Sequence, residues 1–224
     1  MKIGVLGATG PAGGGLAARL ASIGYEVIAG SRDSARAEAA VAKLRGQWGD
    51  RVRGLEAGGN ADAANADLVV VATQWEAAVP TAAQHADALT GKVVIAMANG
   101  LAKHGREFHP VLPEEGSISM AMQAAAPGAR VAAAMHLIPA SVFGDLDHPI
   151  DSDVIVCADD DAARETVLDL VTGIPDVRGF DGGSLANAVG LEAFAAVLLT
   201  INLRHKGKGR LRLLGVEPRP PAGP

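Results

Sequence analysis

The chain has little of what several classes of protein require. Cysteine occurs once in 224 residues, as Cys157, which excludes an internal disulfide and a cysteine-rich metal cluster. The thiol lies in an apolar segment, as expected for a small buried hydrophobe in a reducing compartment. We therefore expect a cytoplasmic protein.

Positive charge is not in excess either. The formal net charge is −5, which makes nucleic acid an unsuitable partner. Met1 leads directly into an apolar strand without a charged leader, and no run reaches the length of a transmembrane helix. We expect neither a signal sequence nor a membrane span.

The motifs of hydrolytic and metal chemistry are missing as well. The sequence contains no G-x-S-x-G elbow, and its histidines and acidic residues do not have the spacing of metal ligands. We therefore expect no metal. Aromatic residues make up only 3% of the chain and glycines number 28, so that Ala, Val and Leu must fill the core, as is common in layered α/β proteins.

What the chain does have is a glycine-rich turn near its start. An apolar strand from Ile3 to Leu6 breaks at Gly7, and small residues then open a helix. Backbone N–H groups at such a helix start favour a pyrophosphate. The pattern, with Gly7, Gly10 and Gly13, is an imperfect form of the dinucleotide-binding motif. We expect the phosphates at Gly10, Pro11, Ala12 and Gly13; the alternative is a glycine-rich turn without a ligand.

The end of the second strand, Glu26 to Ala29, indicates which dinucleotide binds. Gly30-Ser31-Arg32 follows it, where an NAD-binding protein would carry an acidic residue. A guanidinium matches the geometry of a phosphate, so Arg32, with hydroxyls from Ser31 and Thr9, favours NADP. The alternative is that Arg32 is a surface residue and Asp33 binds the ribose.

Further strands are expected near residues 52–55, 68–72, 93–98 and 131–135. Ligands of open α/β sheets lie beyond the carboxyl ends of the strands. The site should therefore be formed by residues 7–13, 31–32, 73–75, 97–101 and 136–140. These ranges place Thr73, Trp75, Ala98 and Asn99 beside the dinucleotide. His136 either interacts with a product or ring, or is structural; Trp75 either shapes the pocket or caps the sheet edge.

The pattern changes after Pro149. Strands at 154–157 and 177–180 flank a helix at 161–172, and a long helix, Leu185 to His205, is apolar on nearly every face. This helix either belongs to a second domain or packs against a partner chain. We expect an α/β fold with two domains, residues 1–148 of doubly wound Rossmann type and residues 149–217 smaller, and a disordered tail at 218–224.

Several segments, taken together, resemble the F420-dependent NADP reductases. They are Gly7–Gly15, Gly30–Arg32, Gln74–Glu76, His136–Ala140, Asp145–Leu146, Asp153–Cys157, Asp159–Asp161 and Asp181–Asn187. The resemblance runs in order from Met1 to about Arg204; Gln74, Leu137, Ser184 and the ending from Lys206 depart from the family pattern.

The resemblance implies hydride transfer between NADP(H) and the 8-hydroxy-5-deazaflavin coenzyme F420, which acts as a diffusible second substrate. It also implies a homodimer. By motif, Thr9, Ser31 and Arg32 would hold the 2′-phosphate, Gly10–Gly13 the pyrophosphate, and Trp75 the nicotinamide side. His136, Leu137, Ile138, Pro139 and Ala140 would line the deazaflavin pocket.

Two other functions fit the same architecture. One is an NADP-dependent reductase of an imine, a carbonyl compound or a metal chelate, which would need a proton donor such as His136. The other is a non-catalytic NADP(H) sensor. Separately, the basic residues Arg204, Lys206, Lys208, Arg210 and Arg212 have two interpretations. They are either a solvated helix end or, with the coenzyme that the resemblance implies, a surface that attracts its anionic tail.

Overall fold

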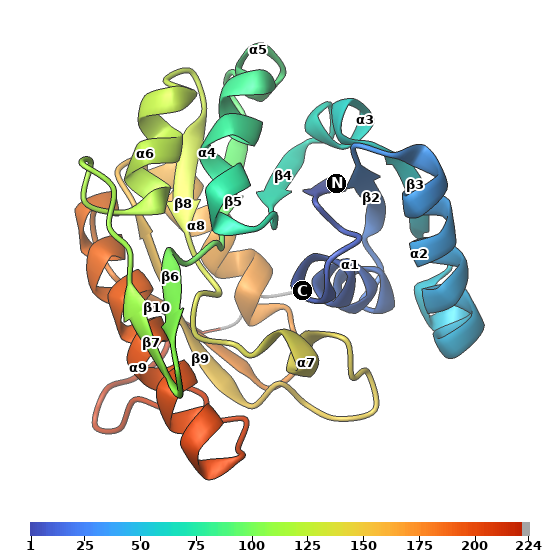
Figure 1. Cartoon of the computed structure of the whole chain (residues 1–224). Coiled ribbons are helices and arrows are strands. Elements are labelled where there is room, and N and C mark those ends of the chain that lie inside the picture. Colours follow the sequence, from blue (N-terminus) through green and yellow to red (C-terminus); the bar gives the residue numbers. More distant parts are fainter. Residues whose placement is uncertain (221–224) are drawn as a thin grey trace.

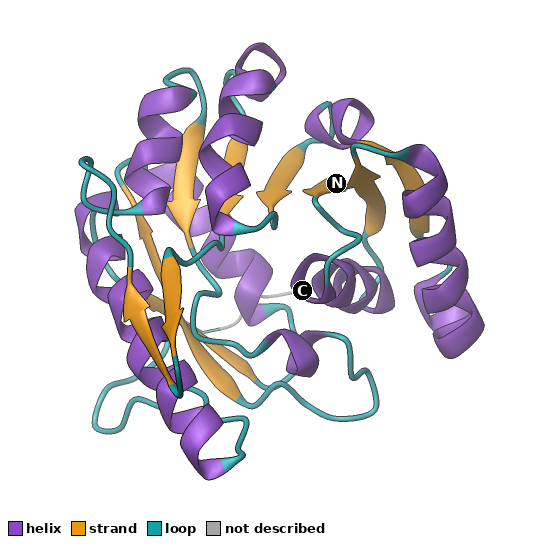
Figure 2. Ribbon diagram, viewed as in Figure 1, coloured by secondary structure: helices purple, strands orange, loops and turns teal. Residues whose placement is uncertain are grey.

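One large sheet, with helices on both faces, organises residues 1–220, the part of the chain that this computed structural model describes (Figures 1 and 2). The strand order is β10-β9-β8-β5-β4-β1-β2-β3. The six strands from β8 to β3 are parallel, whereas β9 runs antiparallel to β8 and β10 is parallel to β9. The predicted doubly wound, mostly parallel α/β fold is confirmed.

The strands of the large sheet are β1 (Lys2–Leu6), β2 (Glu26–Ser31), β3 (Leu55–Gly59), β4 (Leu68–Val71), β5 (Val93–Ala96), β8 (Arg130–Ala133), β9 (Ser152–Ala158) and β10 (Val177–Asp181). A separate hairpin is formed by β6 (Leu101–His104) and β7 (Glu107–Pro110). The α-helices are α1 (Pro11–Ser22), α2 (Ser34–Trp48), α3 (Asn60–Ala64), α4 (Trp75–Gln84), α5 (Ala86–Leu89), α6 (Ile118–Ala125), α7 (Ala140–Phe143), α8 (Asp161–Thr172) and α9 (Ala188–His205). Two 3₁₀ turns, η1 (Gly49–Val52) and η2 (Leu185–Asn187), complete the described elements.

The central strands are buried on both faces because each face has its own hydrophobic core. All of β4 is buried, with Val70 in the core that includes α1 and α8, and with Val69 and Val71 in the core that includes α4 and α6. This alternation follows from the two-residue period of a strand. It explains why the strand sequences are continuously apolar.

Some boundaries differ from the predicted ones. The strand expected near 52–55 begins only at Leu55, because residues 49–52 form η1. The strand expected to reach Met135 ends at Ala133, and Met135 has a left-handed backbone with φ 67°. The β6–β7 hairpin and α6 were not predicted.

The segment expected to be a second domain adds its two strands to the same sheet. β9 and β10 continue the sheet beyond β8, so the division into residues 1–148 and 149–217 stays a prediction. The expectation of a disordered tail at 218–224 stays a prediction; within it, the backbone N–H of Arg219 donates to the carbonyl of Gly179, and its guanidinium pairs with Glu165 and Asp169. Residues 221–224 lie outside the described residues.

Helix α9 runs beside the β6–β7 hairpin (Figure 1). By length and composition alone, Leu185–His205 is long and apolar enough to cross a membrane, which corrects the expectation that no run has that length. The helix nevertheless buries Glu192, a carboxyl group, and its neighbours Ala195 and Ala196. These buried side chains show that α9 packs within the folded chain.

Candidate active site

The glycine-rich turn holds the start of α1 open toward the carboxyl ends of the strands. Gly7 has φ +83°, which favours glycine, and a Cβ at Gly13 would lie 2.8 Å from the carbonyl oxygen of Gly7. Gly10 provides no side-chain cap for α1, and Pro11 at the first helical position has no N–H. The N–H groups of Ala12 and Gly13 are therefore available to an anion. The turn fits a pyrophosphate.

The residues at the end of β2 distinguish the two interpretations given above, in which either Arg32 binds a 2′-phosphate or Asp33 binds the ribose. Asp33 caps α2, where its carboxylate accepts a hydrogen bond from the backbone N–H of Arg36. The hydroxyl of the buried Ser31 accepts from the backbone N–H of Asp33 at 3.2 Å. Arg32 is exposed between them. Its guanidinium is accessible to a phosphate, whereas the Asp33 carboxylate already serves the helix.

Thr73 and Trp75 lie at the neighbouring strand end. A Cβ at Gly7 would be 2.8 Å from Cγ2 of Thr73, so Thr73 contacts the glycine turn directly. The Thr73 hydroxyl is buried without a hydrogen-bond partner among residues 1–220. Trp75 is the first residue of α4, half-buried against the core that includes α6.

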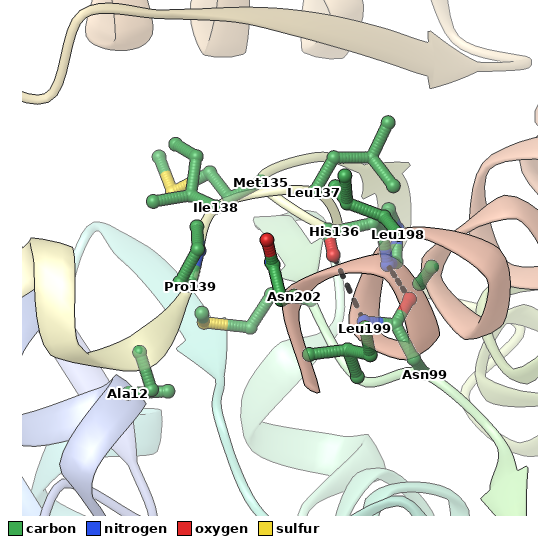
Figure 3. Close-up of a pocket in the computed structure, with 13 residues that line it drawn as sticks. Ala12, Asn99, Met135, His136, Leu137, Ile138, Pro139, Leu198, Leu199 and Asn202 are labelled. Carbon is green, nitrogen blue, oxygen red and sulfur yellow. Dashed lines mark hydrogen bonds between the residues drawn. The ribbon is translucent and has the colours of Figure 1, made fainter. Parts of the chain in front are cut away.

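A cavity of about 200 Å³ lies beside the glycine turn (Figure 3). Four separate parts of the chain form its wall: the start of α1, the loop after β5, the loop after β8, and α9. The lining residues are Ala12, Met97, Asn99, Met135, His136, Leu137, Ile138, Pro139, Ala140, Ala195, Leu198, Leu199 and Asn202.

The cavity brings together part of the expected site. Ala12, Asn99 and the whole 136–140 segment line it. Thr9, Gly10, Pro11, Gly13, Ser31, Arg32, Thr73, Trp75 and Ala98 are not among its lining residues. The latter residues lie at or next to the glycine turn and the strand ends β2, β4 and β5, which is the path that a dinucleotide follows in this fold. Their roles stay predictions.

Asn99 and His136 join the loops after β5 and β8. The Asn99 side-chain N–H donates to the backbone carbonyl of His136 at 2.9 Å, and Nδ1 of His136 lies 3.1 Å from Oδ1 of Asn99. His136 is 6% exposed. Its burial lowers the pKa from 6.5 to about 4, so the ring is neutral at pH 7.

The α9 wall is the part of the site that the sequence reasoning missed. Ala195, Leu198, Leu199 and Asn202 line the cavity, and their spacing places them on one face of the helix. In the sequence, this face could have been recognised by the helical spacing of the three apolar residues and Asn202. The spacing did not stand out because the other faces of α9 are apolar too.

A buried arginine fixes the segment that follows the 136–140 loop. Arg19 of α1 is 5% exposed and donates to the carbonyl oxygens of Val142, Phe143, Asp145 and His148. Four carbonyl acceptors satisfy a guanidinium that burial would otherwise penalise. The segment 142–148, which begins in α7, is thereby tied to the helix whose first turn faces the cavity.

The arginines of the basic cluster near the C-terminus make contacts within the chain, and the expected tail-binding surface stays a prediction. Arg204 pairs with Glu107, Arg210 donates to the carbonyl of Ile150, and Arg212 pairs with Asp151 and Asp153.

Chemically, the cavity suits a reaction between two organic rings. Its wall is mainly aliphatic, with Asn99, His136 and Asn202 as polar members. Within residues 1–220, no group of three or more His, Cys, Asp or Glu side chains is arranged to hold a metal ion. Hydride transfer requires position, electrostatics and exclusion of water from the protein, and these residues can supply all three.

Comparisons with known proteins agree with this geometry. The family model described as "NADP oxidoreductase coenzyme F420-dependent" matches residues 2–100. The F420-dependent NADP reductase of Methanocaldococcus jannaschii is 34% identical over 227 aligned residues, covering 97% of this chain and 100% of that protein. A crystal structure from Arthrobacter sp. FB24, provisionally assigned as an F420-dependent NADP reductase, matches with TM-score 0.77 and 29% identity over 93% of this chain and 96% of that one.

A more distant structural similarity concerns the fold alone. An imine reductase from Bacillus cereus matches with TM-score 0.62 and 18% identity, covering 92% of this chain and 62% of that one.

Proposed function

We propose, because this chain belongs to the family of F420-dependent NADP reductases, that it transfers a hydride between NADP(H) and coenzyme F420 in the cavity beside α1. The observation that carries this placement is the composition of the wall: Ala12 from the dinucleotide turn and His136–Ala140 from the loop after β8 line one space. Two rings can meet there away from water, and NADP(H) supplies or accepts the hydride.

The residues of this chain would divide the binding as follows. The free N–H groups at Ala12 and Gly13 hold the pyrophosphate, and Arg32, with Ser31 and Thr9, holds the 2′-phosphate. Thr73, Trp75, Ala98 and Asn99 lie along the nicotinamide side, and the 136–140 loop with α9 encloses the deazaflavin ring.

The direct test mixes the protein with NADPH and oxidised F420 and follows the deazaflavin absorbance. Reduction that depends on the protein supports the proposal. NADPH binding without deazaflavin reduction would overturn it in favour of a sensor or of another reductase. The buried, neutral ring of His136 argues against an imine or carbonyl reductase, which would need a proton donor there.

We also propose a homodimer in the cytoplasm. Phe194, Val197 and Ile201 of α9 are 41%, 51% and 45% exposed and fall on one face of the helix. A second copy of the chain would cover this stripe. Val197→Glu should convert a dimeric mass in light scattering to the monomer, whereas Leu214→Glu, at an apolar side chain that is 88% exposed, should not. A monomeric wild-type protein would refute the dimer.

A further inference from the structure

Two hydrogen bonds connect Asn99 and His136. One joins the Asn99 side-chain nitrogen to the backbone carbonyl of His136, and the other joins the Asn99 side-chain oxygen to the ring nitrogen Nδ1. Figure 3 shows the Asn99 amide facing both the backbone carbonyl and the ring of His136. The amide lies 2.9 Å from the carbonyl and 3.1 Å from Nδ1. Both distances are those of ordinary hydrogen bonds.

The chemistry of the groups fixes where the ring proton is. A backbone carbonyl only accepts hydrogen bonds, so the NH₂ of Asn99 must face the carbonyl of His136. The amide oxygen of Asn99 then faces Nδ1, and because this oxygen also only accepts, Nδ1 must carry the proton. In the neutral ring, Nε2 is left as an unprotonated acceptor.

The surroundings of the ring keep it in this form. Burial lowers the His136 pKa to about 4. Asp153 is the one charged residue that lines the small second cavity next to His136, and its carboxylate is committed to Arg178 and Arg212. Nε2 is buried and has no hydrogen-bond partner among residues 1–220.

We propose that Asn99 is a positioning residue that holds His136 as the neutral Nδ1–H tautomer, so that Nε2 accepts a hydrogen bond from an N–H or O–H group of the bound deazaflavin. The identity of that ligand rests on the proposed function. His136 thereby selects a ring with a donor at its edge.

This assignment has a consequence for the proton of the reaction. Reduction of F420 by NADPH moves one hydride, with both electrons, from the nicotinamide to the deazaflavin, and one proton must join the reduced deazaflavin. An Nε2 without hydrogen has no proton to give. The proton therefore does not come from this nitrogen, and NADPH, F420 and H⁺ yield NADP⁺ and reduced F420.

The tautomer can be read directly by NMR of the whole protein with ¹⁵N-labelled histidine. The chain has six histidines, and the spectrum of His136→Gln identifies the signals of His136. At pH 7 we expect the pattern of a neutral ring protonated at Nδ1. An imidazolium, or a ring protonated at Nε2, would overturn the proposal. This reading requires no turnover, so it is independent of whether the proposed function holds.

Two variants test whether Asn99 positions the His136 ring or only packs against it. Asn99→Leu should shift His136 toward the Nε2–H tautomer, which is the commoner form in water. Asn202→Leu removes a different amide from the same cavity wall and should leave the His136 pattern unchanged. If Asn99→Leu retains the wild-type pattern in a folded protein, Asn99 does not fix the tautomer.

A second measurement addresses the ligand. Adding oxidised F420 to the labelled protein should shift Nε2 of His136 in the direction of an accepted hydrogen bond, and an unshifted Nε2 would contradict the acceptor role. His136→Phe should raise KM for F420 about tenfold, the loss of one buried hydrogen bond, with kcat changing less. His136→Gln, whose amide oxygen can accept, should recover part of that loss; equal KM values for the two variants would count against the proposal.

Discussion

Glu192 of α9 accepts a 2.7 Å hydrogen bond from the backbone N–H of Ile118, the first residue of α6. Its other carboxylate oxygen accepts from the backbone N–H and the hydroxyl of Ser119 at 3.0 Å and 2.7 Å. The carboxyl group is buried, and burial raises its pKa. A side chain of the cavity-lining helix thus caps a helix that packs against the opposite side of the sheet from α1.

Replacing this carboxyl group should therefore destabilise the fold. Glu192→Ala leaves two backbone donors and a hydroxyl of α6 buried without acceptors, and we expect a loss of about 2–3 kcal/mol in the free energy of unfolding. Denaturant titration measures it. Glu38→Ala, at an exposed position of α2, should change stability by less than about 0.5 kcal/mol. Equal effects of the two substitutions would show that Glu192 adds nothing as a cap.

His136 predicts a dependence of stability on pH. Its pKa falls from 6.5 to about 4 in the folded chain, so the unfolded chain takes up the proton first as the pH drops. The stability that this ring contributes is fully present above pH 6.5 and is lost as the pH falls from 6.5 toward 4, by about 3 kcal/mol. His136→Gln should remove that part of the slope in unfolding experiments at pH 7, 5.5 and 4. His148→Gln, at an exposed side chain, should keep it.

A pair of glycine substitutions tests the turn. Gly13→Ala places a Cβ 2.8 Å from the Gly7 carbonyl and 3.0 Å from Cβ of Ala72, so we expect a cost of about 1–3 kcal/mol and weaker NADPH binding. Gly46→Ala is the matched control, because no atom lies within 4 Å of a Cβ there. In the interior of α2 it should stabilise by about 1 kcal/mol. If Gly13→Ala changes neither the stability nor NADPH binding, the turn can accommodate a Cβ at this position.

The glycine turn and the parallel strands were predictable because their signals are local. Each depends on a few neighbouring residues, such as the break at Gly7 or the continuous apolar run of β4. The β6–β7 hairpin was missed because its strands are four residues each and half polar. The place of α9 beside the cavity was missed because a helix that is apolar all round does not indicate which face meets the site. That information lies in long-range contacts, such as those of Glu192.

Arg32 should set the preference for NADPH. A charge-assisted contact with the 2′-phosphate contributes roughly 1.5–3 kcal/mol, about one to two decades of affinity. Arg32→Glu should lower the NADPH to NADH ratio of kcat/KM by that factor, because a carboxylate repels the phosphate and accepts from ribose hydroxyls. Asp33→Asn should leave the ratio unchanged, since Asp33 caps α2. A ratio that responds to Asp33 and not to Arg32 would reverse the assignment.

Asn202 links the cavity wall to the chain that follows α9. Its side chain donates to the carbonyl of Gly209 at 3.2 Å and accepts from the N–H of Gly209, across a turn in which Lys206 has φ 52°. Asn202→Ala removes both bonds, so we expect a loss of about 1–2 kcal/mol. KM for F420 should rise several-fold while KM for NADPH stays the same, because Asn202 lines the cavity and the glycine turn lies on α1. Lys206→Gly relieves the left-handed backbone and should stabilise by roughly 1 kcal/mol without changing either KM. Equal changes in both KM values for Asn202→Ala would indicate a general loss of structure instead of a displaced wall.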